Sequence, residues 1–200
     1  MIVTYPGYLM KKLIFCLVIT VCAVQLINAQ FTKIGGGIAF SNGFKFHNLD
    51  DEANQSGHFA AFLKGIYEIS PPLHVSPSFT FFYPNITEDA STNTIVTSMM
   101  FDINGQYVFS SSDRFEFYGL AGLDILLTWK KDKYESSGTF KESDNALGLN
   151  AGAGSCLKIT EKTALFAEAK YIISKYGQLM LNAGILINLG GITGSGKQGK

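Results

Sequence analysis

Hydrophobic residues recur at every second position through most of this chain, and this period of two constrains its fold more than any other feature. In the segment 179–189 the odd positions are Leu, Leu, Ala, Ile, Ile and Leu. Six further segments between residues 58 and 174 share the pattern, and in all seven the odd-numbered residues are apolar while the even-numbered ones are mixed, polar or small. Strands with two different faces produce this alternation, whereas helices would not preserve its parity. With a weaker glycine-rich segment at 32–41, the sequence predicts eight β-strands.

The connections between these segments alternate in length. Short turns lie near residues 70–72, 110–114 and 161–163, and longer polar stretches, interpreted as loops, cover 42–56, 84–93 and 130–145. Long loops at one end and tight turns at the other are typical of an antiparallel up-and-down barrel that crosses a membrane.

The composition of the two faces indicates which one meets lipid. Charged residues make up 16% of the chain, and the odd face carries almost none of them, while the even face is rich in glycine. A cylinder with this odd face outward would expose far more apolar area than a soluble monomer does. We therefore predict an all-β, eight-stranded antiparallel transmembrane barrel. A soluble periplasmic lipid-binding barrel is the alternative, and it predicts extraction without detergent.

Charged residues of both signs fall on the even face, which becomes the lumen of the predicted barrel. Buried charges are tolerated when they are paired and hydrogen-bonded. The sequence thus predicts an ion-pair network in the lumen. Its members are Lys64, Glu68, His74, Asp102, Glu116, Asp124, Lys158, Glu168 and Lys170.

Aromatic residues gather near both ends of the apolar faces, with aliphatic residues between them. Two such bands match the interfacial girdles of membrane barrels, although strands favour aromatic residues in any case. The predicted girdle consists of Phe59, Tyr67, Phe81, Tyr83, Tyr107, Phe109, Phe115, Phe117 and Trp129.

The first residues are typical of a secretory signal peptide, with Lys11 and Lys12 before an apolar run of about a dozen residues. We expect a signal peptide at 1–29, a barrel at 30–189 and a flexible Gly/Lys tail at 190–200, with a retained anchor as the alternative for the first segment. Translation starts at Met1 or at Met10. The zero net charge and the single arginine, Arg114, argue against nucleic-acid binding.

Together the signal segment, the alternating strands, the long and short connections and the last strand at 179–189 resemble the outer-membrane protein β-barrel domain family, with its small barrels of the OmpA, OmpX and OmpW type. The resemblance implies a Gram-negative outer membrane, with short turns in the periplasm and long loops outside. It also implies outer-membrane lipid, the barrel-assembly machinery and an extracellular ligand as partners of a monomer. Chains of this family usually end on an aromatic residue, whereas here eleven residues follow Leu189.

Three functions are consistent with this barrel. The first is a structural or interaction role without catalysis, metal or cofactor, in which the outer loops serve adhesion, envelope integrity or defence. An OmpW-like channel for small apolar solutes is the second, suggested by apolar even-face residues. A lipid-modifying enzyme using His74 and Ser76 is the third. The apolar even-face residues are Met100, Leu120, Leu126 and Leu186.

Overall fold

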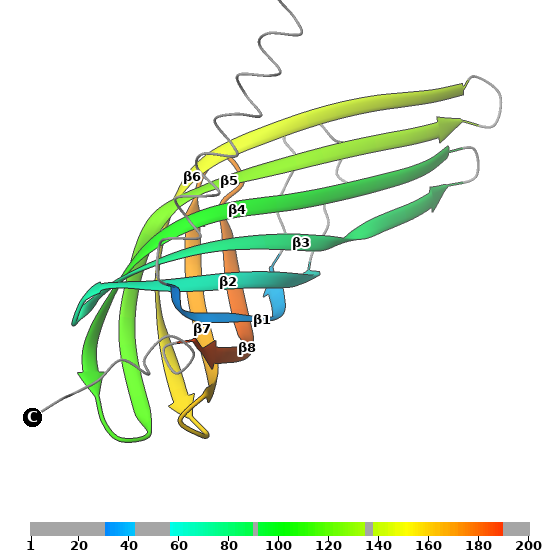
Figure 1. Ribbon diagram of the computed structural model, residues 1–200. Helices are drawn as coiled ribbons and strands as arrows, with labels where there is room; N and C mark the ends of the chain where they lie inside the picture. Colours follow the sequence, from blue (N-terminus) through cyan, green and yellow to red (C-terminus); the bar gives the residue numbers. More distant parts are fainter. Residues whose placement is uncertain (1–30, 43–56, 90–91, 135–137, 190–200) are drawn as a thin grey trace, which may run out of the picture. The chain divides into compact units, whose positions relative to one another are not determined.

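A computed structural model describes residues 31–42, 57–89, 92–134 and 138–189, which form a closed barrel of antiparallel strands (Figure 1). Each strand pairs with its neighbours in the chain, and β8 pairs with β1 to close the barrel. This confirms the predicted eight-stranded up-and-down topology. The strands are β1 (Phe31–Ser41), β2 (His58–Ser70), β3 (Leu73–Asp89), β4 (Thr92–Ser111), β5 (Phe115–Tyr134), β6 (Gly138–Lys158), β7 (Thr163–Ile173) and β8 (Gln178–Asn188).

The predicted signal peptide at 1–29, the tail at 190–200 and nearly all of the loop at 42–56 lie outside the described residues. Among the residues that are described, no helix has the length and apolar character needed to span a membrane.

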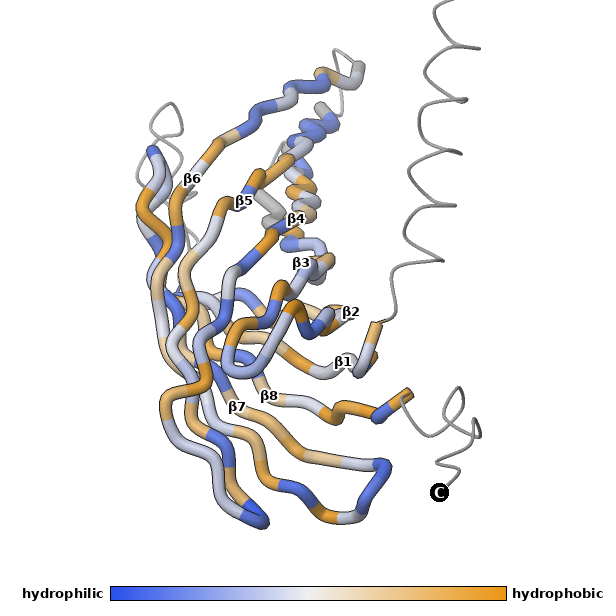
Figure 2. Tube along the Cα trace, turned by 60° about the vertical axis from the view of Figure 1, so that its left-hand side comes forward, coloured by the Kyte–Doolittle hydropathy of each residue, from blue (hydrophilic) through white to orange (hydrophobic). Residues whose placement is uncertain are grey.

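Hydrophobic side chains cover the outside of the barrel. The odd-numbered residues of β2 to β8 point outward, except beyond the bulge after Phe82 of β3, where the parity is reversed and Ile86 is exposed. Leu147 is 73% and Leu63 is 65% exposed, while Met100 and Ile172 on the even face are fully buried. Hydrophobic and hydrophilic positions accordingly alternate along the strands (Figure 2). An apolar surface of this extent is stable in hydrocarbon and not in water. The odd face therefore meets lipid, and the soluble alternative is wrong.

The first strand has the opposite parity, because its even residues face outward. Ile34 and Ile38 are exposed, whereas Ala39 is buried. The register explains this reversal, since Ile34 lies opposite Ile187 of β8 and directly paired residues share a face. Odd residues of β1, including Lys33, consequently face the lumen.

Two of the three predicted loops are wrong in extent. β3 continues to Asp89 and β4 begins at Thr92, while β5 continues to Tyr134 and β6 begins at Gly138. The ladder runs on because its backbone hydrogen bonds do not depend on side-chain polarity. The polar sequence at 84–93 and 130–145 marks where the strands leave the apolar region and not where they end.

These extensions form a four-stranded sheet that projects beyond the rest of the barrel (Figure 1). β2 pairs with β3 only as far as the pair Ala60–Phe82, and β7 pairs with β6 only as far as Ile173–Leu149. Above these pairs, β3 to β6 bond only to one another among the described strands. We call this extension the arm; it comprises residues 83–89, 92–97, 129–134 and 138–143.

Candidate functional site

The centre of the lumen is crossed by an ion pair between strands on different sides of the barrel. Lys64 of β2 donates to Glu168 of β7, and both side chains are almost fully buried. Glu168 Oε1 also accepts hydrogen bonds from the Tyr118 hydroxyl at 2.8 Å and from Gln106 Nε2 at 3.3 Å. The Lys64 ammonium lies 5.0 Å from the centre of the Phe166 ring. The pair is thus held by groups from four strands, β2, β4, β5 and β7, and lies in the middle of the barrel.

A second ion pair joins β7 to β4. Lys170 Nζ is 3.0 Å from Asp102 Oδ2, and both side chains are buried. The same carboxylate accepts hydrogen bonds from the Ser78 hydroxyl at 2.7 Å and from Asn104 Nδ2. Such multiple bonding is what allows a charge to remain in a buried position.

Asp124 differs from its predicted partners, because it forms no ion pair within the described residues. It lies opposite Asp102 in the ladder and is 2% exposed. Neither of its carboxylate oxygens has a hydrogen bond of standard geometry in the described part of the chain, although the Asn150 amide lies near enough to interact with it. The expected pairing fails here because the nearest lysine, Lys170, is already bonded to Asp102.

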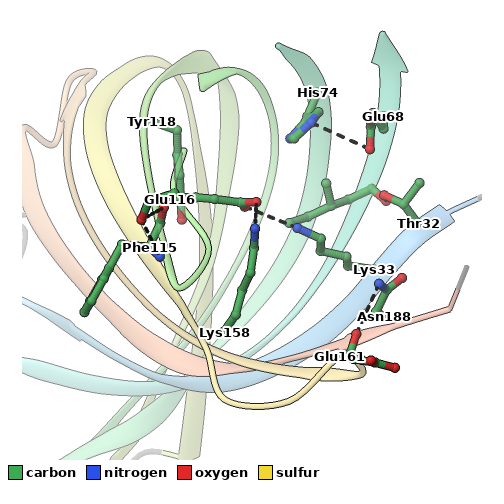
Figure 3. A network of polar contacts seen from close by, with 12 residues as sticks. Thr32, Lys33, Glu68, His74, Phe115, Glu116, Tyr118, Lys158, Glu161 and Asn188 are labelled. Atoms are coloured by element: carbon green, nitrogen blue, oxygen red, sulfur yellow. Dashed lines mark hydrogen bonds and ion pairs between the residues drawn. The ribbon is translucent and has the colours of Figure 1, made fainter. Parts of the chain in front are cut away.

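A third cluster lies at the short-turn end of the lumen (Figure 3). Glu116 of β5 bridges Lys158 of β6 at 2.8 Å and Lys33 of β1 at 3.4 Å. Lys33 was missing from the predicted network, since it lies on the one strand whose parity is reversed. Only its pairing with β8 could have revealed its position.

His74 and Glu68 face each other at the same end, with 4.0 Å between Nε2 and Oε2 (Figure 3). Ser76 is fully buried, and its hydroxyl has no hydrogen-bond partner among the described residues. No bond joins His74 to Ser76 in that part of the chain, so the structure does not show the activated serine that a lipid-modifying enzyme needs.

The proposed girdle residues lie on the outside of the barrel. Phe59 is 61%, Phe109 62% and Trp129 42% exposed, and Phe81 is half-buried. Phe115 and Phe117 stack with their ring centres 6.4 Å apart. Tyr67, Tyr83 and Tyr107 are also exposed.

The turn between β7 and β8 is tied to the base of the arm. Asp144 of β6 accepts hydrogen bonds from Lys175 Nζ and from the Tyr176 hydroxyl, both in that turn. These hydrogen bonds, first from Lys175 and then from Tyr176, lower the pKa of the Asp144 carboxyl. On the arm itself, Lys130 pairs with Asp132 at 2.9 Å, and the Thr94 hydroxyl donates to the same Asp132 at 2.8 Å.

The described residues contain no group of three or more His, Cys, Asp or Glu side chains placed to hold a metal ion. The lumen residues described above engage in hydrogen bonding and charge pairing.

Comparison with known proteins agrees with this geometry. The model of a family described as "outer membrane protein beta-barrel domain" matches residues 13–191. Among curated proteins, no chain matches significantly.

Solved structures share the fold at low sequence identity. Ail, the attachment invasion locus protein of Yersinia pestis, is 20% identical with a TM-score of 0.53, covering 78% of this chain and 97% of Ail. Neisserial surface protein A is 16% identical with a TM-score of 0.51, covering 78% and 96%. The N-terminal barrel of Pseudomonas aeruginosa OprF is 14% identical with a TM-score of 0.51, covering 80% and 98%.

Proposed function

The chain belongs to the outer membrane protein β-barrel domain family, and from this premise we propose that it is a surface-interaction barrel with an adhesive or structural role. Its location is the cell outer membrane. The arm is the observation that carries the proposal. It extends the hydrogen-bonded sheet of β3 to β6 beyond the apolar surface and thereby holds polar side chains away from the membrane on a regular scaffold.

The packing of the lumen supports this role over transport. The Lys64–Glu168 pair crosses the barrel, and Phe62 and Phe166 meet edge to face beside it, with ring centres 5.8 Å apart. The apolar residues that suggested an OmpW-like route, such as Met100 and Leu186, are buried within the packed interior. An eight-stranded barrel has an interior just wide enough for such side chains. We propose neither a channel nor an enzyme.

A partner outside the cell is part of the proposal. The Ail protein, 22% identical with a TM-score of 0.52 and covering 78% of this chain and 97% of Ail, has been solved in complex with the heparin analogue sucrose octasulfate. That complex supports the idea that a small barrel of this fold presents a binding surface. We further propose that the chain is inserted by the barrel-assembly machinery and acts as a monomer surrounded by outer-membrane lipid.

Shortening the arm tests the proposed role. The matched variant replaces residues 131–141 by an Asn-Gly turn, which suits a two-residue hairpin and leaves the barrel strands below unchanged. We expect bacteria displaying this variant to attach to host-cell matrix at least tenfold less than bacteria displaying the intact chain. A heat-modifiable band on a gel confirms that both barrels are folded, and equal attachment would contradict the proposal.

Recording in planar bilayers tests the alternative. A lumen crossed by buried ion pairs is expected to show no stepwise conductance. Reproducible channels from the intact chain would favour the transport function and would overturn the closed-lumen argument.

A further inference from the structure

The two faces of the arm carry different charges. On the face that continues the lumen wall, Lys130 lies opposite Glu142 and beside Asp132. On the outer face, the charged side chains that the structure describes are all lysines. These are Lys131 and Lys133 of β5 and Lys141 of β6, and we call them the lysine patch.

Within the lysine patch, Lys131 and Lys141 are direct cross-strand partners. Like charges in this arrangement repel and destabilise a sheet. The side chains of Lys133 and Lys141 are exposed, and no ion pair joins any of the three lysines to a side chain that the structure describes. A patch of like positive charges of this kind favours an anionic ligand.

The position of the patch identifies that anion. Trp129 lies on the same outer face, two residues before Lys131, and is 42% exposed. Tryptophan marks the boundary between hydrocarbon and headgroups. At a rise of about 3.3 Å per residue, Lys131 stands roughly 7 Å further along the strand. Long lysine side chains extend into the headgroup layer from such positions.

We propose that the lysine patch is a binding site for phosphate groups of lipids in the adjacent leaflet. The site anchors the base of the arm and is distinct from any contact that the arm makes with an extracellular partner. Because the ligand is part of the membrane itself, this inference does not depend on the adhesive role.

Trp129, the only tryptophan of the chain, provides the probe. The folded chain is placed in phosphatidylcholine nanodiscs that contain either dibrominated phosphatidic acid or dibrominated phosphatidylcholine, whose bromines quench tryptophan fluorescence on contact. One lysine near an anionic surface corresponds to about a fivefold preference. We expect phosphatidic acid to associate with the Trp129 region roughly fivefold more strongly or better at low salt, and to lose much of this advantage in 0.5 M salt.

A pair of matched variants assigns the preference to the patch. In the double variant Lys131→Gln, Lys141→Gln, we expect the association of phosphatidic acid with the Trp129 region to differ from that of phosphatidylcholine by less than twofold. Arg114→Gln with Lys162→Gln removes the same charge from exposed turns at the opposite end and is expected to retain the preference. If the double variant folds poorly, Lys133→Gln alone replaces it. We expect this single change to reduce the preference for phosphatidic acid over phosphatidylcholine measurably.

Three results would overturn the inference. The first is equal quenching by both lipids with the intact chain. The second is an unchanged preference for phosphatidic acid in the Lys131→Gln, Lys141→Gln variant. The third is a loss of that preference in the control variant as large as in the patch variant. Binding of a soluble sulfated polysaccharide through these lysines without any lipid preference would assign the patch to a different ligand and would also contradict the proposal.

Discussion

Asp102 of β4 and Asp124 of β5 are direct partners in the ladder and both are buried, yet within the described part of the chain only Asp102 forms an ion pair. Lys170 lies 3.0 Å from Asp102, while both carboxylate oxygens of Asp124 lack a hydrogen bond of standard geometry among the described residues. Two carboxylates of the same type, side by side, therefore contribute to stability in opposite directions.

Replacing Asp124 by asparagine is expected to stabilise the barrel. The substitution keeps the shape of the side chain and removes a buried charge without a partner, so the free energy of unfolding should rise by about 1–3 kcal/mol. Asp102→Asn is the matched change, and it is expected to lower that free energy because it leaves Lys170 buried without its counter-ion. Guanidinium chloride unfolding in detergent, followed by Trp129 fluorescence, measures both. Destabilisation by Asp124→Asn would contradict the account given for this residue.

The Lys64–Glu168 pair should show the asymmetry of buried ion pairs. Glu168→Gln leaves the Lys64 charge buried and unpaired, and we expect it to cost about 3–5 kcal/mol of unfolding free energy. The double change Lys64→Met, Glu168→Met removes both charges, and we expect it to cost less than the single one. Guanidinium chloride unfolding in detergent measures the free energy of unfolding of both variants. A double variant less stable than Glu168→Gln would show that the unpaired Lys64 charge is not the main cost.

Two glycines on neighbouring strands offer a test of how closely the lumen is packed. A Cβ atom at Gly152 would meet the Ala169 carbonyl oxygen and would come within 2.7 Å of the Lys170 Cα, whereas one at Gly119 meets nothing within 4 Å. Gly152→Ala is therefore expected to destabilise the barrel by about 1–3 kcal/mol. Gly119→Ala serves as the control and should leave the unfolding midpoint nearly unchanged. Similar midpoints for the two variants would contradict the close approach at Gly152.

Acid should loosen the turn between β7 and β8. The hydrogen bonds from Lys175 and Tyr176 lower the pKa of Asp144 in the folded state. Their stabilising effect is thus fully present above the ordinary carboxyl pKa of about 4 and is lost as the pH falls through the lowered folded value. Protection factors of the turn amides, corrected for intrinsic exchange, should be lower at pH 2 than at pH 6. In Asp144→Asn the difference between the two pH values should disappear, and a persistent difference would point to another group.

Part of the candidate site was predictable because its signal is local. Lys64, Glu168, Asp102 and Lys170 lie at even positions of strongly alternating segments, so their place on the inner face follows from the period of two. The extent of the arm was not predictable in the same way. Polar residues at 84–93 and 130–145 look like loops in a sequence, although the ladder continues through them as far as Asp89 and Tyr134.

The sequence by itself determined that the chain forms strands, how many there are, and which face of β2 to β8 is apolar, because hydrophobic alternation acts within each strand. The tertiary structure alone decided which charges meet. Lys64 reaches Glu168 from β2 to β7, Lys33 joins Glu116 from β1 to β5, and Asp124 has no ion-pair partner among the residues that the structure describes. These relationships depend on the closure and stagger of the barrel, which place residues from distant strands at the same height and which no local pattern encodes.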